Sequence, residues 1–145
     1  MRQRKRNSVT PAEDLLSGMP TLTEQTVAEY FAAIRSMDLE RCVAVFAANA
    51  VQHDPVGAPP NVGLEAIRAF FTQIFTGFKT VSLTEDAVYA NGSSAAVKWT
   101  GKGVSHSGKP ITFEGVDVID CDEAGKIVLV RAFWDPAPVM AVLQS

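Results

Sequence analysis

The chain has 145 residues, 47% of them hydrophobic and 20% charged, a balance that is typical of one globular domain and excludes general disorder. No apolar run reaches the roughly 18–20 residues that a membrane-spanning helix needs, which excludes an integral membrane protein. Residues 1–6 carry four of the 13 Lys and Arg residues and none of the 16 Asp and Glu residues, so the remainder of the chain has a net charge of −7. Such an acidic domain is unsuited to binding nucleic acid, because it repels the phosphate backbone.

The basic N-terminus opens a segment, residues 1–20, that contains two prolines and a glycine among polar residues. We predict a flexible basic arm with one short turn at residues 12–16, followed by a single domain over residues 21–145. No apolar stretch follows the basic residues to form a secretion signal. The only cysteines, Cys42 and Cys121, are too few for a disulfide framework, so we expect a reducing, cytoplasmic setting.

The first predicted helix begins at Thr21, because Thr21-Leu22-Thr23-Glu24 has the spacing of a capping box. Its apolar residues repeat at the intervals of an amphipathic helix: Leu22, Val27, Tyr30, Phe31 and Ile34. A shorter helix, capped by Asp38, presents Leu39, Cys42, Val43 and Phe46. A brief extended segment over residues 50–54 and a turn-rich stretch over 55–63 precede a third helix, whose apolar side consists of Leu64, Ile67, Phe70, Phe71 and Phe75.

From Thr80 onward the apolar residues alternate with polar ones, a period of two that predicts strands. The predicted strands cover residues 80–90, 94–105, 110–121 and 127–135. Turn signals separate them: Asn91-Gly92, Ser107-Gly108 and Glu123-Ala124-Gly125. Helices followed by antiparallel strands predict an α+β fold, in which the helices cover one face of the sheet. A strongly curved sheet of this kind encloses a pocket.

Asp117 lies on the third predicted strand, on the face shared by Phe113 and Ile119, while Val116 and Val118 lie on the opposite face. If the first face is buried, the carboxyl group lies in apolar surroundings, its pKa rises and it stays protonated near neutral pH. If the second face is buried, Asp117 is an ordinary aspartate in contact with water. The alternation by itself favours neither interpretation.

Tyr30 and Asp54 each have a common structural explanation. A tyrosine on the apolar side of a helix is usually a core residue whose hydroxyl has a hydrogen-bond partner. An aspartate before a proline, as in Asp54-Pro55, commonly opens a turn. Taken one at a time, these two residues predict no function.

Taken together, three segments resemble the ketosteroid isomerases, which belong to the superfamily of cone-shaped α+β domains that includes nuclear transport factor 2 and the polyketide cyclases. Val27-Ala28-Glu29-Tyr30 resembles the segment with the family's oxyanion tyrosine, and His53-Asp54-Pro55-Val56-Gly57 resembles the segment with its catalytic base. Gly115-Val116-Asp117-Val118-Ile119 resembles the strand with its protonated aspartic acid. The resemblance extends over residues 22–142 and implies three N-terminal helices packed on a strongly curved, mainly antiparallel sheet around an apolar pocket.

The resemblance implies a steroid Δ-isomerase that converts 3-oxo-Δ5-steroids to 3-oxo-Δ4-steroids. Asp54 would abstract the proton, while Tyr30 and a neutral Asp117 would donate hydrogen bonds to the oxygen of the dienolate intermediate. The resemblance also implies that the steroid is contacted by Trp134, Val56 and Phe71. Such proton transfer requires no metal and no cofactor, and the sequence offers no Cys/His ligand cluster. The implied partners are a small apolar ketone and, through the outer face of the sheet near Phe133, a second copy of the chain.

This sequence departs from the family at Phe46 and Phe71, which stand where some members have tyrosines that extend the hydrogen-bond network of the oxyanion tyrosine. Two other functions remain open: a polyketide cyclase-like enzyme using the same base and acid, and a non-catalytic module that binds an apolar ligand. A limonene epoxide hydrolase is disfavoured, because no arginine pairs with Asp54. A Ser–His–Asp hydrolase is disfavoured because there is no nucleophile elbow. We expect Asp135 to be a solvated strand end.

Overall fold

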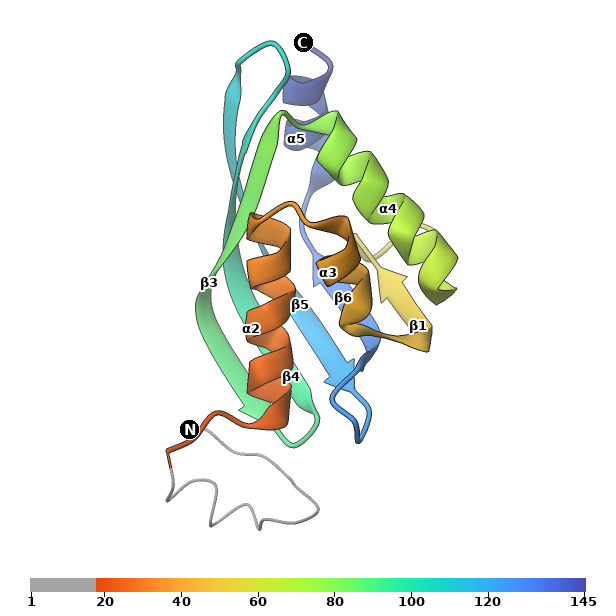
Figure 1. The fold of residues 1–145 in the computed structure, drawn as a ribbon. Helices are drawn as coiled ribbons and strands as arrows, with labels where there is room; N and C mark the ends of the chain where they lie inside the picture. Colours follow the sequence, from red (N-terminus) through yellow and green to blue (C-terminus); the bar gives the residue numbers. More distant parts are fainter. Residues whose placement is uncertain (1–17) are drawn as a thin grey trace.

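The computed structural model describes residues 18–145; the turn predicted at 12–16 and all but the last three residues of the predicted basic arm lie outside them. In the described part the elements are α2 Leu22–Arg35, α3 Leu39–Ala44, β1 Phe46–His53, β2 Asn61–Val62, α4 Gly63–Gly77, β3 Thr80–Asn91, β4 Ser94–Val104, β5 Pro110–Cys121, β6 Ile127–Phe133 and α5 Pro136–Leu143 (Figure 1). The predicted α+β class is confirmed. None of these helices is long and apolar enough to cross a membrane.

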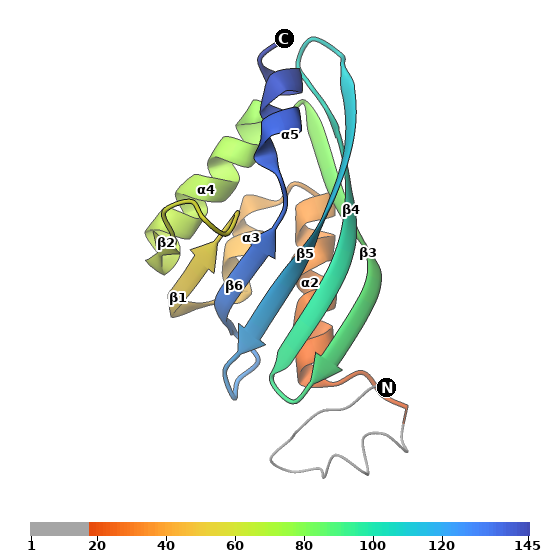
Figure 2. The same ribbon diagram turned by 180° about the vertical axis from the view of Figure 1, so that it is seen from behind.

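The strands form one curved six-stranded sheet in the order β2-β1-β6-β5-β4-β3. The neighbours β1 and β6 are parallel, and the other neighbouring pairs are antiparallel. Helices α2, α3 and α4 cover one face of the sheet, and the view from behind shows the outer face of β3 to β6 without a helix over it (Figure 2). The C-terminal α5 lies at the open end, between α4 and the β4–β5 hairpin. This is the expected cone, and its inside is the core.

The start of helix α2 and the turns between the strands lie where local sequence signals predict them. The capping box of α2 is confirmed: the Thr21 hydroxyl accepts from the Glu24 N–H at 2.9 Å, and the Glu24 carboxylate accepts from the Thr21 N–H at 2.8 Å. The three turns predicted between strands contain Gly92, Gly108 and Gly125, each with a positive φ. Residues with a side chain rarely adopt this backbone conformation, which explains the glycines.

Two elements differ from the sequence prediction. Strand β1 begins at Phe46, earlier than the predicted extended segment, because Phe46 pairs with Ile127 in the parallel ladder to β6. Residues 136–143 form α5, which was not predicted, since its two prolines resemble a helix-breaking tail. Proline at the first helical position is favourable, and the Asp135 carboxylate accepts from the Ala137 N–H at 3.0 Å. Asp135 is therefore the N-cap of α5 rather than a strand end.

Candidate active site

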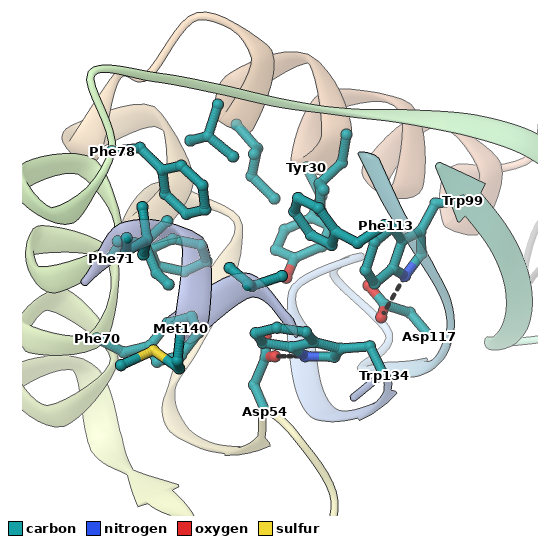
Figure 3. A pocket seen from close by; sticks show the side chains of 16 residues that line it. Tyr30, Asp54, Phe70, Phe71, Phe78, Trp99, Phe113, Asp117, Trp134 and Met140 are labelled. Carbon is teal, nitrogen blue, oxygen red and sulfur yellow. Dashed lines mark hydrogen bonds between the residues drawn. The ribbon is translucent and has the colours of Figure 1, made fainter. Parts of the chain in front are cut away.

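An apolar pocket lies between the inner face of the sheet, α4 and α5, and Tyr30, Asp54 and Asp117 contribute the polar groups that line it. Its other walls are aromatic and aliphatic side chains (Figure 3). Phe70, Phe71 and Phe78 lie on the α4 side, and the Tyr30 hydroxyl points toward the side where both carboxyl groups lie. The structure therefore brings together, from α2, the end of β1 and β5, the three residues that the resemblance implied.

Asp117 is 2% exposed, so the buried face of β5 is the one that it shares with Phe113 and Ile119. The Trp99 indole N–H donates a hydrogen bond to Asp117 Oδ1 at 2.9 Å. Burial, followed by the nearby negative charge of Asp54, raises the pKa of Asp117 to about 8, although the Trp99 hydrogen bond acts to lower it. At neutral pH the carboxyl group is therefore mainly protonated and can donate a hydrogen bond.

Asp54 follows directly after β1 and meets the second indole of the pocket. The Trp134 N–H donates to Asp54 Oδ1 at 2.6 Å. Burial raises the pKa of Asp54 to about 7, and the Trp134 hydrogen bond opposes this effect. Asp54 keeps partial solvent contact, whereas Asp117 is almost completely enclosed and its ionisation is opposed in addition by the negative charge of Asp54. Of the two carboxyl groups, Asp54 is the one that ionises first.

Tyr30 is 1% exposed and is held by aromatic rings. Its ring lies edge-on to Phe31, Phe46 and Phe71, with centroids 5.3, 5.9 and 6.3 Å away. Burial and then the charges of Asp117 and Asp54 raise the pKa of Tyr30 well above its ordinary value. Tyr30 thus remains a neutral hydroxyl donor, and Phe46 and Phe71 pack against it as apolar supports.

Of the three residues expected to contact substrate, two line the pocket and one does not. Trp134 and Phe71 line the pocket. Val56 does not line it: its side chain is 42% exposed, and its backbone N–H donates to the Ala132 carbonyl at 2.8 Å, which ties this segment to β6. Within residues 18–145, no group of three His, Cys, Asp or Glu side chains could hold a metal ion.

The sequence analysis did not identify Trp99 and Gly115 as parts of the site. The one sequence feature that could have identified them is the turn at Ser107-Gly108. This turn sets the β4–β5 register, in which Trp99 pairs with Gly115 and therefore lies diagonally beside Asp117 on the same face. A Cβ atom at Gly115 would lie 2.5 Å from the Trp99 ring and 2.9 Å from Trp134 Cβ. The missing side chain of Gly115 is what lets both tryptophans pack here.

The arrangement gives two similar carboxyl groups opposite tasks. Each accepts an indole N–H on one oxygen, and within the described residues the second oxygen accepts no hydrogen bond. The partly exposed Asp54 is suited to removing a proton, while the enclosed Asp117 and Tyr30 are suited to donating hydrogen bonds to a developing negative charge. Separated acidities of this kind are typical of an acid–base catalytic site.

Residues 27–130 match the model of the SnoaL-like domain family. The chain is also similar to SalBIII, described as an epoxide hydrolase/cyclase-like enzyme in pyran ring formation in the polyether salinomycin, with 28% identity and a TM-score of 0.73 over 79% of this chain and 92% of that one. A Jannaschia sp. CCS1 protein described as a SnoaL-like polyketide cyclase has the same fold, with 18% identity and a TM-score of 0.76 over 87% and 94% of the two chains. So does an NTF2-like protein of Burkholderia pseudomallei K96243, with 20% identity and a TM-score of 0.77 over 86% and 99%. The chain belongs to the SnoaL-like domain family.

Proposed function

We propose that this protein is an acid–base enzyme of the cyclase type, which closes a ring in an apolar, polyketide-like carbonyl compound through an enolate. The observation that carries this proposal is the pair of indole-bound carboxyl groups, one suited to ionise and one to stay neutral, beside a tyrosine in one apolar pocket. Membership of the SnoaL-like family and the similarity to a cyclase-like enzyme favour ring closure over steroid isomerisation.

The reaction begins with ionised Asp54, which takes a proton from a carbon atom between two carbonyl groups. The electron pair of the C–H bond moves toward one carbonyl oxygen, to which Tyr30 and neutral Asp117 donate hydrogen bonds. The enolate carbon then attacks a second carbonyl carbon of the same molecule and forms the new C–C bond. The resulting alkoxide takes the proton back from Asp54. Every proton is returned within the pocket, so these steps need no cofactor.

Steroid Δ-isomerisation is the second candidate, because Tyr30, Asp54 and Asp117 line one pocket as the resemblance to ketosteroid isomerases implied. The first step is the same proton abstraction, here from C4 of a 3-oxo-Δ5-steroid. The reaction differs in its second half, since Asp54 returns the proton to C6 and no new C–C bond forms. The two candidates therefore share a base and differ in product.

The first step can be tested separately from the product. In deuterated buffer, the enzyme should exchange the acidic C–H of an apolar β-dicarbonyl compound, measured by NMR, and Asp54→Asn should slow this exchange by about 10²–10⁴-fold. A cyclised product from a linear poly-β-ketone, which has the same mass as its substrate and is identified by NMR from its new C–C bond, then supports the cyclase. Conjugated enone absorbance from 5-androstene-3,17-dione supports the isomerase instead. Binding of these ketones without any exchange would contradict both and favour a non-catalytic binding module.

We also propose a homodimer that buries the outer face of the sheet. Phe133 and Val116 are directly opposed on β6 and β5 and are 45% and 37% exposed. Tyr89, on β3, adds a third exposed apolar side chain to the same face. An uncovered sheet face with large apolar residues is typical of a protein–protein contact.

A further inference from the structure

Gln52 is a buried polar residue beside the site that the proposed mechanism does not use. It lies on β1, two residues before Asp54, and its side chain is 0% exposed. Its Oε1 accepts a hydrogen bond from Asn61 Nδ2 at 2.9 Å, across the β1–β2 pair. Its Nε2 is the one buried side-chain nitrogen or oxygen in residues 18–145 that has no hydrogen-bond partner. An unpaired buried N–H lowers stability, so its presence calls for an explanation.

The Tyr30 hydroxyl is the group on which this amide acts. The nearby Gln52 amide acts to lower the pKa of Tyr30, against burial and the two carboxyl groups, which raise it. An amide can stabilise a phenolate only by donating its N–H, so the interaction comes from Nε2. Because Asn61 binds Oε1, the nitrogen of the Gln52 amide is directed away from Asn61.

We propose that Gln52 is a positioning residue for Tyr30: Nε2–H completes a hydrogen bond to the Tyr30 oxygen when Tyr30 donates its own proton to a ligand in the pocket. This inference rests on the proposed function, in which Tyr30 serves a ligand oxygen. A hydroxyl that donates becomes a stronger acceptor, and catalytic hydrogen bonds often tighten only when a ligand binds. The amide N–H cannot accept the tyrosine proton, so the proton is left to point into the pocket.

The surroundings of Tyr30 explain why an amide is needed. The rings that contact it, among them Phe46 and Phe71, offer no hydrogen bond. In a low-dielectric site, one correctly placed donor changes the acidity of a phenol more than it would in water. Gln52, held from β2 by Asn61, supplies that donor from the strand that Asp54 directly follows.

The test measures the acidity of Tyr30 directly and needs no substrate. Tyr30 and Tyr89 are the only tyrosines, so in a Tyr89→Phe background labelled with 3-fluorotyrosine, whose phenol is more acidic than that of tyrosine, a fluorine NMR titration reports Tyr30 alone. Gln52→Leu should make Tyr30 about tenfold less acidic, the effect of losing a hydrogen bond to a charged oxygen. Gln52→Met, which is unbranched, repeats the measurement should the leucine variant fail to fold. Unchanged acidity in a folded variant would overturn the proposal.

Two further measurements separate positioning from a purely structural link between β1 and β2. In the nitrogen-15 spectrum of the fluorotyrosine-labelled protein, the Gln52 amide protons should shift over the pH range in which Tyr30 ionises, because the phenolate oxygen accepts their hydrogen bond, and Tyr30→Phe should abolish this shift. A Gln52 signal that does not respond to the ionisation of Tyr30 contradicts the proposal. In a rate assay, Gln52→Leu should lower turnover in the wild type but not in Tyr30→Phe, whereas a structural role gives equal losses in both. If no substrate is turned over, the proposed function fails while the two NMR results still decide the role of Gln52.

Discussion

The two carboxyl groups of the pocket show how environment divides one residue type into two roles. Both accept an indole N–H, yet Asp117 is almost fully enclosed beside the charge of Asp54, while Asp54 keeps some contact with solvent. Because both are buried and hydrogen-bonded alike, the negative charge of Asp54, which adds to the effect of burial at Asp117, leaves Asp54 as the group that ionises first. A base and an acid can therefore operate together only over a limited pH range.

This predicts a bell-shaped dependence of kcat/KM on pH for the proton-abstraction step. The rate should rise through about pH 7, as Asp54 ionises, and fall above about pH 8, as Asp117 loses its proton. The two apparent pKa values belong to the interacting pair. Measuring exchange or turnover from pH 5 to 10 checks this prediction. A rate that keeps rising above pH 9 would show that a neutral Asp117 is not required.

The two tryptophans provide a matched pair of variants. Trp134→Phe removes the donor to Asp54 and raises the pKa of that carboxyl, so the acidic side of the profile should move to higher pH. Trp99→Phe removes the donor to Asp117, so the alkaline side should move to higher pH instead. Each variant serves as the control for the other. Equal movement of both sides in both variants would contradict the separate pairing.

At the scale of elements, the β4–β5 hairpin builds the acidic half of the site. Its turn sets the register that puts Trp99 over Gly115 and beside Asp117. The close packing at Gly115 is a steric requirement, because a Cβ there would lie 2.6 Å from the backbone carbonyl oxygen of Phe133 as well as 2.5 Å from Trp99. A single methyl group at this position would press on β6 and on the indole that binds Asp117.

Gly115→Ala should therefore lower stability by about 1–3 kcal/mol, the usual range for overpacking, and lower activity further by displacing the indoles. Thermal unfolding and turnover measured on the same sample separate the two effects. Gly77→Ala is the matched control, since the nearest atom to its added Cβ would be 3.9 Å away, and it should leave both quantities nearly unchanged. Equal behaviour of the two variants would show that Gly115 has no special packing role.

Much of the fold could be predicted from local signals. The capping box at Thr21, the helical stripe of α2 and the glycine turns each depend on a few neighbouring residues, and the structure agrees with them. The early start of β1 at Phe46 depends on pairing with β6, about eighty residues away, and so could not be predicted. Helix α5 was missed because its prolines at the N-terminus look like a breaker.

The candidate site was predictable only in part, for the same physical reason. Tyr30 and Asp54 could be singled out by resemblance, but alternation alone could not decide which face of β5 is buried, because both faces carry apolar residues. The decision depends on where the helices pack. The Gln52 amide gives no sequence signal, since its importance comes from an unpaired nitrogen near a tyrosine on another element.

For the molecule as a whole, the uncovered sheet face should control assembly. Phe133→Glu places a charge in the proposed apolar contact and should convert a dimer to a monomer, measured by light scattering after size exclusion. The fold should be unaffected, because Phe133 lies on the outer face, opposite to the pocket. Thr112→Glu, on the same outer face but toward the far end of β5, is the control. A wild-type protein that is already monomeric at high concentration would contradict the proposed dimer.

The central claim is that Asp117 is a neutral donor beside an ionising Asp54, and carbon-13 NMR of labelled aspartate carboxyl groups measures it most directly. Asp117→Asn and Asp54→Asn assign the two signals. We predict that the Asp117 signal reports a protonated carboxyl at pH 6.5 and titrates near pH 8, and that Asp54 titrates at lower pH than Asp117. An Asp117 signal that titrates near the ordinary value of about 3.9 would contradict the account, because an ionised Asp117 cannot donate to an enolate oxygen.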